Sequence, residues 1–272
     1  MTKTILITGA STGVGAATAV LFAERGWNVV ATMRDLGSGP AVEHDNILRA
    51  RLDVTDKASI ESAITVGSER FGSIDAVVNN AGYGEFGVFE AIDDAKVRAN
   101  FDVNVFGVMN VIRAILPRFR ERNNGLIVNV SSGGGIIGLP ATGIYLSTKF
   151  ALEGFSESIW FELDALGIGL KLVEPGGIST PFLTKITGQA ATNIPPDDYR
   201  PFVEKIKARM AELNWERSSP EDIAEVIWTS VTDGSRRLRY FHGPGIKHLV
   251  DGRHSSTDQD YESLMRREFN VV

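Results

Sequence analysis

The sequence predicts a doubly wound α/β fold, in which a mainly parallel sheet carries helices on both faces. Short apolar segments alternate with longer segments of helical periodicity along the 272 residues. The short segments are almost continuously apolar, as strands are when both faces of a parallel sheet are covered. A glycine-rich loop joins the first strand to the first helix, which is typical of the Rossmann-like class.

Each expected element has a local signal in the sequence. Asp56 is a plausible helix N-cap, Gly26 ends the first helix, and Ser218 or Ser219 precedes a helix that has Pro220 at its first position. Strands are expected at residues 3–8, 27–33, 47–54, 74–82, 125–132, 167–177 and 237–243, and helices at about 14–26, 56–72, 94–122, 143–166 and 220–231.

We expect one domain over residues 1–272, because neither a linker nor an internal repeat interrupts this alternation. The segment from about 180 to 216 breaks it with several prolines and has no regular pattern. It would follow the carboxyl end of a strand, where open sheets bind ligands. We interpret it as a substrate-lid insert, and the alternative is an irregular surface excursion.

The composition narrows the classes of function. The chain has no Cys, which excludes disulfides, thiolate metal sites and cysteine nucleophiles. The formal net charge is −6 and the basic residues are scattered, which disfavours nucleic-acid binding. The densest basic run, 236–239, is expected to be a solvated strand edge. No metal site is predicted, because the spacing of metal ligands is missing at His44, His242, His248 and His254.

The start of the chain and the length of its apolar runs indicate where in the cell the protein is expected. The first strand begins near Thr4, which leaves no room for a secretory signal. We find no apolar run near the roughly 18 residues of a membrane span. We therefore expect a cytoplasmic protein without a membrane partner.

A tyrosine and a lysine stand out in the fourth expected helix. Tyr145 and Lys149 are four residues apart, so a helix places both side chains on one face. An ammonium beside a phenol favours the phenolate and would lower the phenol pKa from its usual value of about 10. Such a phenol can give or take a proton. Tyr145 alone is more often a packed aromatic residue, so the pairing with Lys149 carries the prediction.

The glycine-rich loop reads Thr8-Gly9-Ala10-Ser11-Thr12-Gly13-Val14-Gly15. Gly9 would permit a tight turn, Gly13 would let the backbone approach a pyrophosphate, and Gly15 would allow close packing of the helix. A glycine cluster alone is a weak signal. Its position between a β-branched strand and an Ala-rich helix strengthens the prediction of a dinucleotide site.

The second expected strand ends at Met33-Arg34-Asp35, where the adenosine ribose is selected in such folds. A cation there pairs with the 2′-phosphate of NADP, whereas an acid bonds the 2′-hydroxyl of NAD. Arg34 precedes Asp35 at this strand end, so we favour NADP (NADPH) over NAD. Asp35 keeps the alternative open.

With these residues in view, the chain resembles the short-chain dehydrogenase/reductase family in its single-domain form. The resemblance runs from about Thr4 to Ile178 and rests on several motifs in family order. Residues matching the cofactor positions are Gly9, Ser11, Thr12, Gly13, Val14, Gly15, Arg34, Asp53, Val54, Asn80, Ala81, Gly82, Tyr145, Lys149, Pro175, Gly176, Ile178 and Thr180. Those matching the catalytic tetrad are Asn104, Ser132, Tyr145 and Lys149.

The resemblance implies an NADP(H)-dependent oxidoreductase that interconverts a ketone or aldehyde and an alcohol. Ser132 would bond the carbonyl oxygen and Tyr145 would be the general acid or base. Lys149 would lower the Tyr145 pKa and hold the nicotinamide ribose, and Asn104 would interrupt its helix and hold a water. One departure is Thr12, which stands where many NADP-using members have a basic residue.

The sequence also gives expectations for the substrate, for assembly and for alternative functions. The substrate would be a small carbonyl or alcohol. The candidate residues for an apolar pocket, each of which could equally belong to the core, are Phe86, Ile136, Leu139, Phe182 and Leu183. The helices at 94–122 and 143–166 carry surplus apolar residues, so we expect a homo-dimer or homo-tetramer. Two alternatives are a non-catalytic NADP-binding redox sensor and a nucleotide-sugar epimerase or dehydratase.

Overall fold

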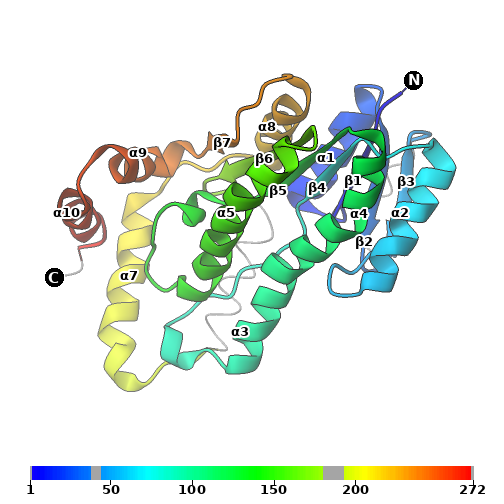
Figure 1. Cartoon of the computed structure of the whole chain (residues 1–272). Coiled ribbons are helices and arrows are strands. Elements are labelled where there is room, and N and C mark those ends of the chain that lie inside the picture. Colours follow the sequence, from blue (N-terminus) through cyan, green and yellow to red (C-terminus); the bar gives the residue numbers. More distant parts are fainter. Residues whose placement is uncertain (1, 38–43, 180–192, 271–272) are drawn as a thin grey trace.

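The computed structural model describes residues 2–37, 44–179 and 193–270. Within them the strands form one sheet in the order β3-β2-β1-β4-β5-β6-β7, and every neighbouring pair is parallel (Figure 1). The strands are β1 (Thr4–Ile7), β2 (Asn28–Met33), β3 (Ile47–Arg51), β4 (Ala76–Asn79), β5 (Gly125–Val130), β6 (Ile168–Pro175) and β7 (Arg239–His242). The order reverses between β1 and β4, which creates the switch point where such sheets bind ligands.

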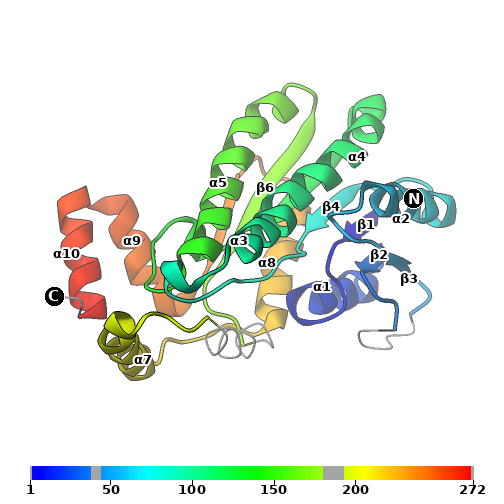
Figure 2. The same ribbon diagram turned by 90° about the horizontal axis from the view of Figure 1, so that it is seen from below.

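Helices cover both faces of the sheet, as the sequence predicts (Figures 1 and 2). On one face α1 (Gly13–Glu24) and α8 (Pro220–Thr232) bury Phe22 and Ile223 against the strands. On the other face α2 (Lys57–Phe71), α4 (Val108–Arg122) and α5 (Gly143–Asp164) form a second core. The doubly wound, parallel α/β fold is therefore confirmed.

Local signals in the sequence fix several helix ends. The Asp56 side chain accepts hydrogen bonds from the amides of Ala58 and Ser59 at 3.0 and 3.3 Å. Ser219 and Asp222 form a reciprocal capping box at the start of α8. Gly26 follows α1 with φ of +82°, a left-handed conformation that glycine adopts at little cost.

The long helix expected at 94–122 is interrupted. It consists of α3 (Asp94–Phe101), a π-helical turn (Asp102–Gly107) and α4. Contrary to the expectation from sequence, the 29 residues from Asp94 to Arg122 are long and apolar enough to cross a membrane by length and composition alone. In this structure 44% of the apolar window is buried, because α4 packs on the sheet.

Three helices beyond β6 are absent from the sequence-based expectation. Residues 200–213 were expected to be irregular, but they form α7 (Arg200–Leu213). Pro201 occupies the first turn of α7, where a proline needs no amide donor, so it begins the helix and does not break it. With α9 (Lys247–Ser255) and α10 (Asp258–Phe269), α7 surrounds a third apolar cluster at one end of the molecule (Figure 2). Residues 180–192 lie outside the described part, and the substrate-lid interpretation stays a prediction.

The carboxyl ends of β6 and β7 meet through backbone alone. The amide of Gly176 donates to the His242 carbonyl at 2.8 Å. A Cβ on Gly176 would lie 2.6 Å from the Cα of Gly243, and a Cβ on Gly243 would lie 2.7 Å from the Cα of Gly176. Only two glycines fit this approach, which brings the segment after β7 against the site.

Candidate active site

The glycine loop has the geometry that the sequence predicts for a phosphate-binding turn. Gly9 has φ of +68° and Gly13 has φ of +57°. A Cβ on Gly9 would lie 2.8 Å from the Cα of Ala81, and one on Gly15 would lie 2.4 Å from the Gly9 carbonyl oxygen. Larger residues would therefore push the loop away from the sheet.

The loop is fastened to the turn after β4. The Asn80 side-chain amide donates to the carbonyls of Thr8 and Gly9 at 2.9 and 3.1 Å. In return, the Thr8 hydroxyl accepts from the amides of Asn80 and Ala81, both at 3.0 Å. Thr8 was not among the predicted site residues, although its position directly before Gly9 marks it as the strand end. These bonds fix both sides of the switch point.

The amino end of α1 is left open for an anion. Thr12 is the N-cap residue in extended conformation, and among the described residues its side chain makes no capping bond. Ser11 is half-buried and Val14 is buried beneath the turn. Unpaired backbone amides and the positive end of a helix favour a phosphate group. The loop therefore fits a dinucleotide.

Arg34 and Asp35 follow β2 and differ in their bonding. The Asp35 carboxylate accepts a hydrogen bond from the Gly37 amide at 2.9 Å, so it stabilises its own turn. Arg34 is exposed and exerts an electrostatic attraction on Asp53. Arg49 donates to the Leu36 carbonyl, so a second guanidinium lies at this strand end.

Asp53 is held rigidly after β3, next to the buried Val54. Its carboxylate accepts from the Thr55 amide at 2.9 Å and from the Thr55 hydroxyl at 2.7 Å. Burial acts to raise the pKa of Asp53, but the bonds from Thr55 and the charges of Arg34 and Arg51 outweigh it, so the pKa lies below its usual value. Asp53 is therefore an ionised hydrogen-bond acceptor near neutral pH.

Asn104 lies in the π-helical turn, which confirms that it interrupts its helix. It is buried, and its side-chain oxygen accepts from the Tyr83 amide at 3.1 Å. Its side-chain nitrogen donates to the Tyr83 carbonyl at 2.8 Å and to the Thr148 hydroxyl at 3.0 Å. A Cβ on Gly82 would lie 3.1 Å from the Asn104 oxygen. Asn104 thus joins the turn after β4 to the helix that carries Tyr145.

Thr148 was missed by sequence reasoning. Its hydroxyl also donates to the Tyr145 carbonyl at 2.7 Å. The signal was present, because Thr148 lies between the two residues of the Tyr-x-x-x-Lys motif.

Ser132 and Tyr145 come together at the carboxyl end of the sheet. The Ser132 hydroxyl accepts from the Gly134 amide at 3.0 Å and forms a hydrogen bond with the Tyr145 side chain. The Phe86 ring packs at 5.4 Å from the Tyr145 ring, measured between ring centres. A serine hydroxyl and a phenol therefore converge on one point, as carbonyl chemistry requires.

The expected lowering of the Tyr145 pKa is wrong for this structure. Burial raises the pKa of Tyr145 to about 12, although its hydrogen bond with Ser132 acts in the opposite direction. Desolvation penalises the phenolate more than the hydrogen bond with Ser132 stabilises it. Tyr145 is therefore a protonated phenol at neutral pH.

Lys149 is buried one helical turn beyond Tyr145. Its Nζ atom donates to the Val130 carbonyl at 2.9 Å and lies 5.7 Å from the centre of the Tyr145 ring. Burial lowers the pKa of Lys149 to about 8, and the charge of Glu153 partly opposes this shift. Lys149 therefore changes its charge in a physiologically accessible range.

The remaining predicted residues follow β6. Pro175 ends the strand and is buried, and the Ser132 hydroxyl donates to its carbonyl at 3.4 Å. Ile178 forms an isolated parallel bridge with Ser218. Thr180, Phe182 and Leu183 lie outside the described residues.

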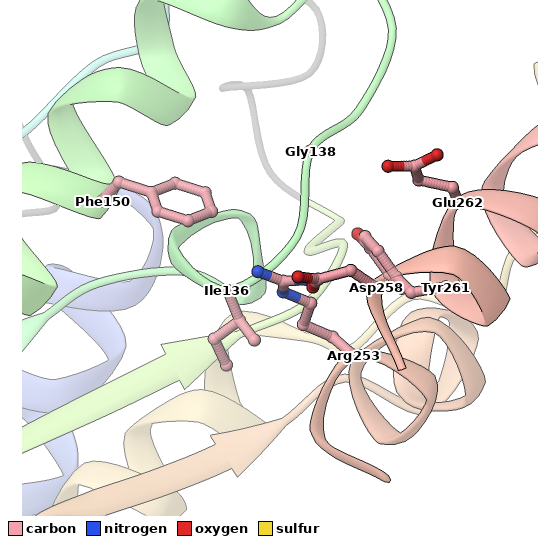
Figure 3. A pocket seen from close by; sticks show the side chains of 7 residues that line it. All are labelled: Ile136, Gly138, Phe150, Arg253, Asp258, Tyr261 and Glu262. Carbon is pink, nitrogen blue, oxygen red and sulfur yellow. The ribbon is translucent and has the colours of Figure 1, made fainter. Parts of the chain in front are cut away.

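A cavity of about 400 Å³ opens beside the loop between Ser132 and Tyr145 (Figure 3). Ile136 and Gly138 line it from this loop and Phe150 lines it from α5, and the C-terminal helices add Arg253, Asp258, Tyr261 and Glu262. A neighbouring hollow is lined by Leu139, Met265 and Phe269 among others. Of the apolar candidates, Ile136 and Leu139 thus face the C-terminal helices, whereas Phe86 contacts Tyr145.

The chain belongs to the short-chain dehydrogenase family. The family model described as short chain dehydrogenase matches residues 3–191, which confirms the resemblance seen in the sequence. The protein is therefore an oxidoreductase of this family, whose members act on small molecules.

The relatives that match over nearly the whole chain include a bacterial oxidoreductase and a human dehydrogenase. An uncharacterized oxidoreductase of Bacillus subtilis is 36% identical and covers 98% of each chain. The 17-beta-hydroxysteroid dehydrogenase type 1 of Homo sapiens is 32% identical over 97% of this chain and 85% of its own length.

Solved structures show the same fold. A short-chain dehydrogenase from Streptomyces avermitilis superimposes with a TM-score of 0.81 at 28% identity, over 100% of this chain and 98% of its own. A 3-ketoacyl-(acyl-carrier-protein) reductase from Brucella melitensis in complex with NADH gives 0.75 at 26% identity, over 90% and 98% of the two chains. A Burkholderia cenocepacia short chain dehydrogenase in complex with NADP gives 0.75 at 23% identity, over 98% and 97%. The fold thus accommodates both nicotinamide cofactors.

Proposed function

We propose that this protein is an NADP(H)-dependent oxidoreductase that interconverts a ketone or aldehyde and an alcohol, with Tyr145 as the general acid or base. The observation that carries the proposal is the convergence of the Ser132 hydroxyl on the Tyr145 side chain, with the buried Lys149 one helical turn away. The glycine loop and the turn after β4 supply a dinucleotide cleft on the same edge of the sheet.

The residues divide the chemistry among them. A reduced nicotinamide, when bound, supplies the hydride. Ser132 donates a hydrogen bond to the substrate oxygen and so stabilises the negative charge that develops there. Tyr145, which is protonated at neutral pH, gives its hydroxyl proton to that oxygen and takes it back in the oxidative direction. Lys149 stabilises the phenolate that is left behind, and Asn104 fixes the helix that carries both residues.

Arg34 is proposed to select NADP. Its guanidinium is exposed at the end of β2, whereas the Asp35 carboxylate already accepts the Gly37 amide. Arg49 and Arg51 add positive charge around this strand end, which compensates for the neutral Thr12. A guanidinium matches a phosphate geometrically and remains charged at any physiological pH.

The substrate is proposed to be a lipophilic ketone or secondary alcohol. Phe86 packs against Tyr145, and Ile136 and Leu139 lie on the loop between Ser132 and Tyr145. The 17-beta-hydroxysteroid dehydrogenase relative is named for an apolar substrate class of this kind. The apolar Phe86 ring beside Tyr145 favours a substrate with little charge.

The experiment is a panel of ketones, aldehydes and secondary alcohols assayed with NADPH and with NADH. Loss of NADPH absorbance with a lipophilic ketone is the expected result. Binding of NADPH without oxidation by any carbonyl would favour the redox sensor instead. Turnover of a nucleotide sugar, with the cofactor returned unchanged, would favour the epimerase.

A further inference from the structure

Two buried carboxyl groups face each other beside the catalytic lysine. Glu153 on α5 and Glu174 on β6 have relative exposures of 7% and 1%. The Nε atom of Arg239 lies 3.2 Å from an oxygen of each carboxyl group. The Oε1 atom of each carboxyl group is buried and makes no hydrogen bond within the described part of the chain. A proton on one of the two groups supplies the donor that these oxygens lack, because ionised carboxylates only accept.

Charged side chains of both signs surround the pair. Glu157 on α5 pairs with the Arg239 guanidinium at 2.6 Å and is half-exposed. Arg237, Lys149 and the Ser131 hydroxyl also act on the pair. The basic run at 236–239 is thus only partly the solvated edge expected from sequence, since Arg236 is exposed but Arg239 is inside this cluster.

Glu153 links this cluster to the active site. It follows Lys149 by four residues on α5, and its charge raises the Lys149 pKa against the effect of burial. No residue in the tetrad other than Lys149 interacts with the cluster among the interactions described.

We propose that Glu153 and Glu174 hold one proton between them, and that the division of this proton sets the charge of Lys149. Glu153 is then a positioning residue that acts through Lys149. This inference rests on the proposed function only where it concerns turnover. Because two buried carboxyl groups beside one guanidinium cannot both ionise cheaply, the pair then carries a single negative charge near neutral pH.

Burial supports this protonation state. It raises the pKa of Glu153, and it raises the pKa of Glu174 to about 8, with the Glu153 charge acting in the same direction. The single charge sits closer to Lys149 when Glu153 is ionised and farther away when Glu174 is ionised. Moving this charge should therefore move the Lys149 pKa in either direction.

Amide variants relocate the charge without removing it. In Glu153→Gln the charge resides on Glu174, so the Lys149 pKa should fall and the basic limb of the reductive pH profile should move to lower pH by about one unit. In Glu174→Gln the charge resides on Glu153, so the limb should move to higher pH by a similar amount. Glu162→Gln, an exposed change on the same helix, is the matched control and should not move it.

Infrared spectroscopy tests the shared proton without any turnover. The cofactor-free wild type at neutral pH should show the carbonyl stretch of a buried protonated carboxyl group. Both amide variants should lose this band, and Glu162→Gln should keep it. In Lys149→Met the band should persist to higher pH, because coupling between two groups is reciprocal.

The outcomes separate this inference from the proposed function. Absence of the band in the wild type overturns the shared proton, and equal shifts of the pH limb in both amide variants overturn its link to Lys149. If an amide variant does not fold, the infrared band of the wild type is compared with that of Lys149→Met. A band that titrates at the same pH in both proteins overturns the link between the carboxyl pair and Lys149. A wild type that shows the band but oxidises no NADPH contradicts the proposed function alone.

Discussion

The ammonium of Lys149 lies 5.7 Å from the centre of the Tyr145 ring and is anchored to the Val130 carbonyl. The cation is thus near the phenol, yet burial acts more strongly on both groups. It raises the pKa of Tyr145 to about 12 and lowers that of Lys149 to about 8. Tyr145 is fully protonated at neutral pH, so its charge is constant there. The charge of Lys149, in contrast, changes with pH near pH 8.

The first prediction concerns pH. Below about pH 8 Lys149 is charged and can stabilise the phenolate, whereas above it the charge is lost. Reductive turnover should therefore decline as the pH rises above about 8, while NADPH remains saturating. Initial rates between pH 6 and 10 measure this, with unfolding checked at each pH by circular dichroism. A rate that is constant up to pH 10 would show that the Lys149 charge is not needed.

The second prediction concerns Tyr145→Phe, which removes only the hydroxyl group. The Phe86 contact and the fold should remain, so NADPH should bind as in the wild type. Turnover should fall by about 10²- to 10⁴-fold, which is the usual contribution of general acid–base catalysis. Steady-state rates and NADPH fluorescence titration measure the two quantities. Near-normal turnover would refute the mechanism.

The third prediction concerns Arg34→Ala. A charge-assisted hydrogen bond is worth roughly 1.5–3 kcal/mol, or about ten- to a hundred-and-fifty-fold in affinity. NADPH binding should weaken by that factor and NADH binding should be nearly unchanged. Calorimetric titration with both cofactors gives the ratio, and Arg70→Ala on α2 serves as an exposed control. An unaltered ratio would transfer the selection to Asp35.

The fourth prediction concerns stability. The buried Lys171 donates to Asp233 at 2.7 Å, and the Tyr240 hydroxyl donates to the same carboxylate at 2.6 Å. Asp233→Asn leaves the lysine without its counter-ion and should lower the free energy of unfolding by about 2–3 kcal/mol. Urea denaturation measures it. Asp164→Asn, which breaks the exposed pair with Arg236, should cost less than about 1 kcal/mol.

The same carboxylate gives a pH dependence of stability. Burial acts to raise the pKa of Asp233, but the bonds from Lys171 and Tyr240 outweigh it and hold the pKa well below its usual range. Its contribution is therefore present above the unfolded pKa of about 4 and is lost as the pH falls further. Equal effects of the two Asn variants at pH 7 would contradict the assignment.

The fifth prediction concerns assembly. Three phenylalanines on the π-helical turn and α5 are exposed, namely Phe106, Phe150 and Phe161. We expect a homo-dimer or homo-tetramer at micromolar concentration, measured by light scattering. Phe161→Glu should dissociate it, whereas Phe89→Glu, equally exposed but outside these elements, should not. A wild-type monomer would refute the expectation.

The strands and helices of the sheet could be predicted because their signals are local. Continuous apolar runs mark strands buried on both faces, and Asp56, Gly26 and Ser219 mark helix ends through their own hydrogen bonds or φ angles. The helix α7 was missed because a proline such as Pro201 occurs both in loops and in the first turn of a helix. Only the position of the helix start distinguishes these two cases. The helix α10 was missed although it has a local cap signal. The Thr257 side chain accepts a hydrogen bond from the Asp260 amide at the start of the helix.

The site was predictable in its residue types and not in its electrostatics. The positions of Asn104, Ser132, Tyr145 and Lys149 follow from motif and spacing. The sign of the Tyr145 pKa shift depends on how much water the folded chain removes, which no local pattern reveals. The Glu153–Glu174 pair joins a helix to a strand through tertiary packing, so it too is invisible in the sequence.

The contact between Gly176 and Gly243 constrains how this chain can be recombined with its relatives. The floor of the cleft and the start of the C-terminal segment meet without any side chain between them. A chimera that exchanges the C-terminal helices must therefore carry a glycine at both junctions, since one Cβ at either place separates the two strand ends. The C-terminal helices are thus exchangeable only between relatives that keep both glycines.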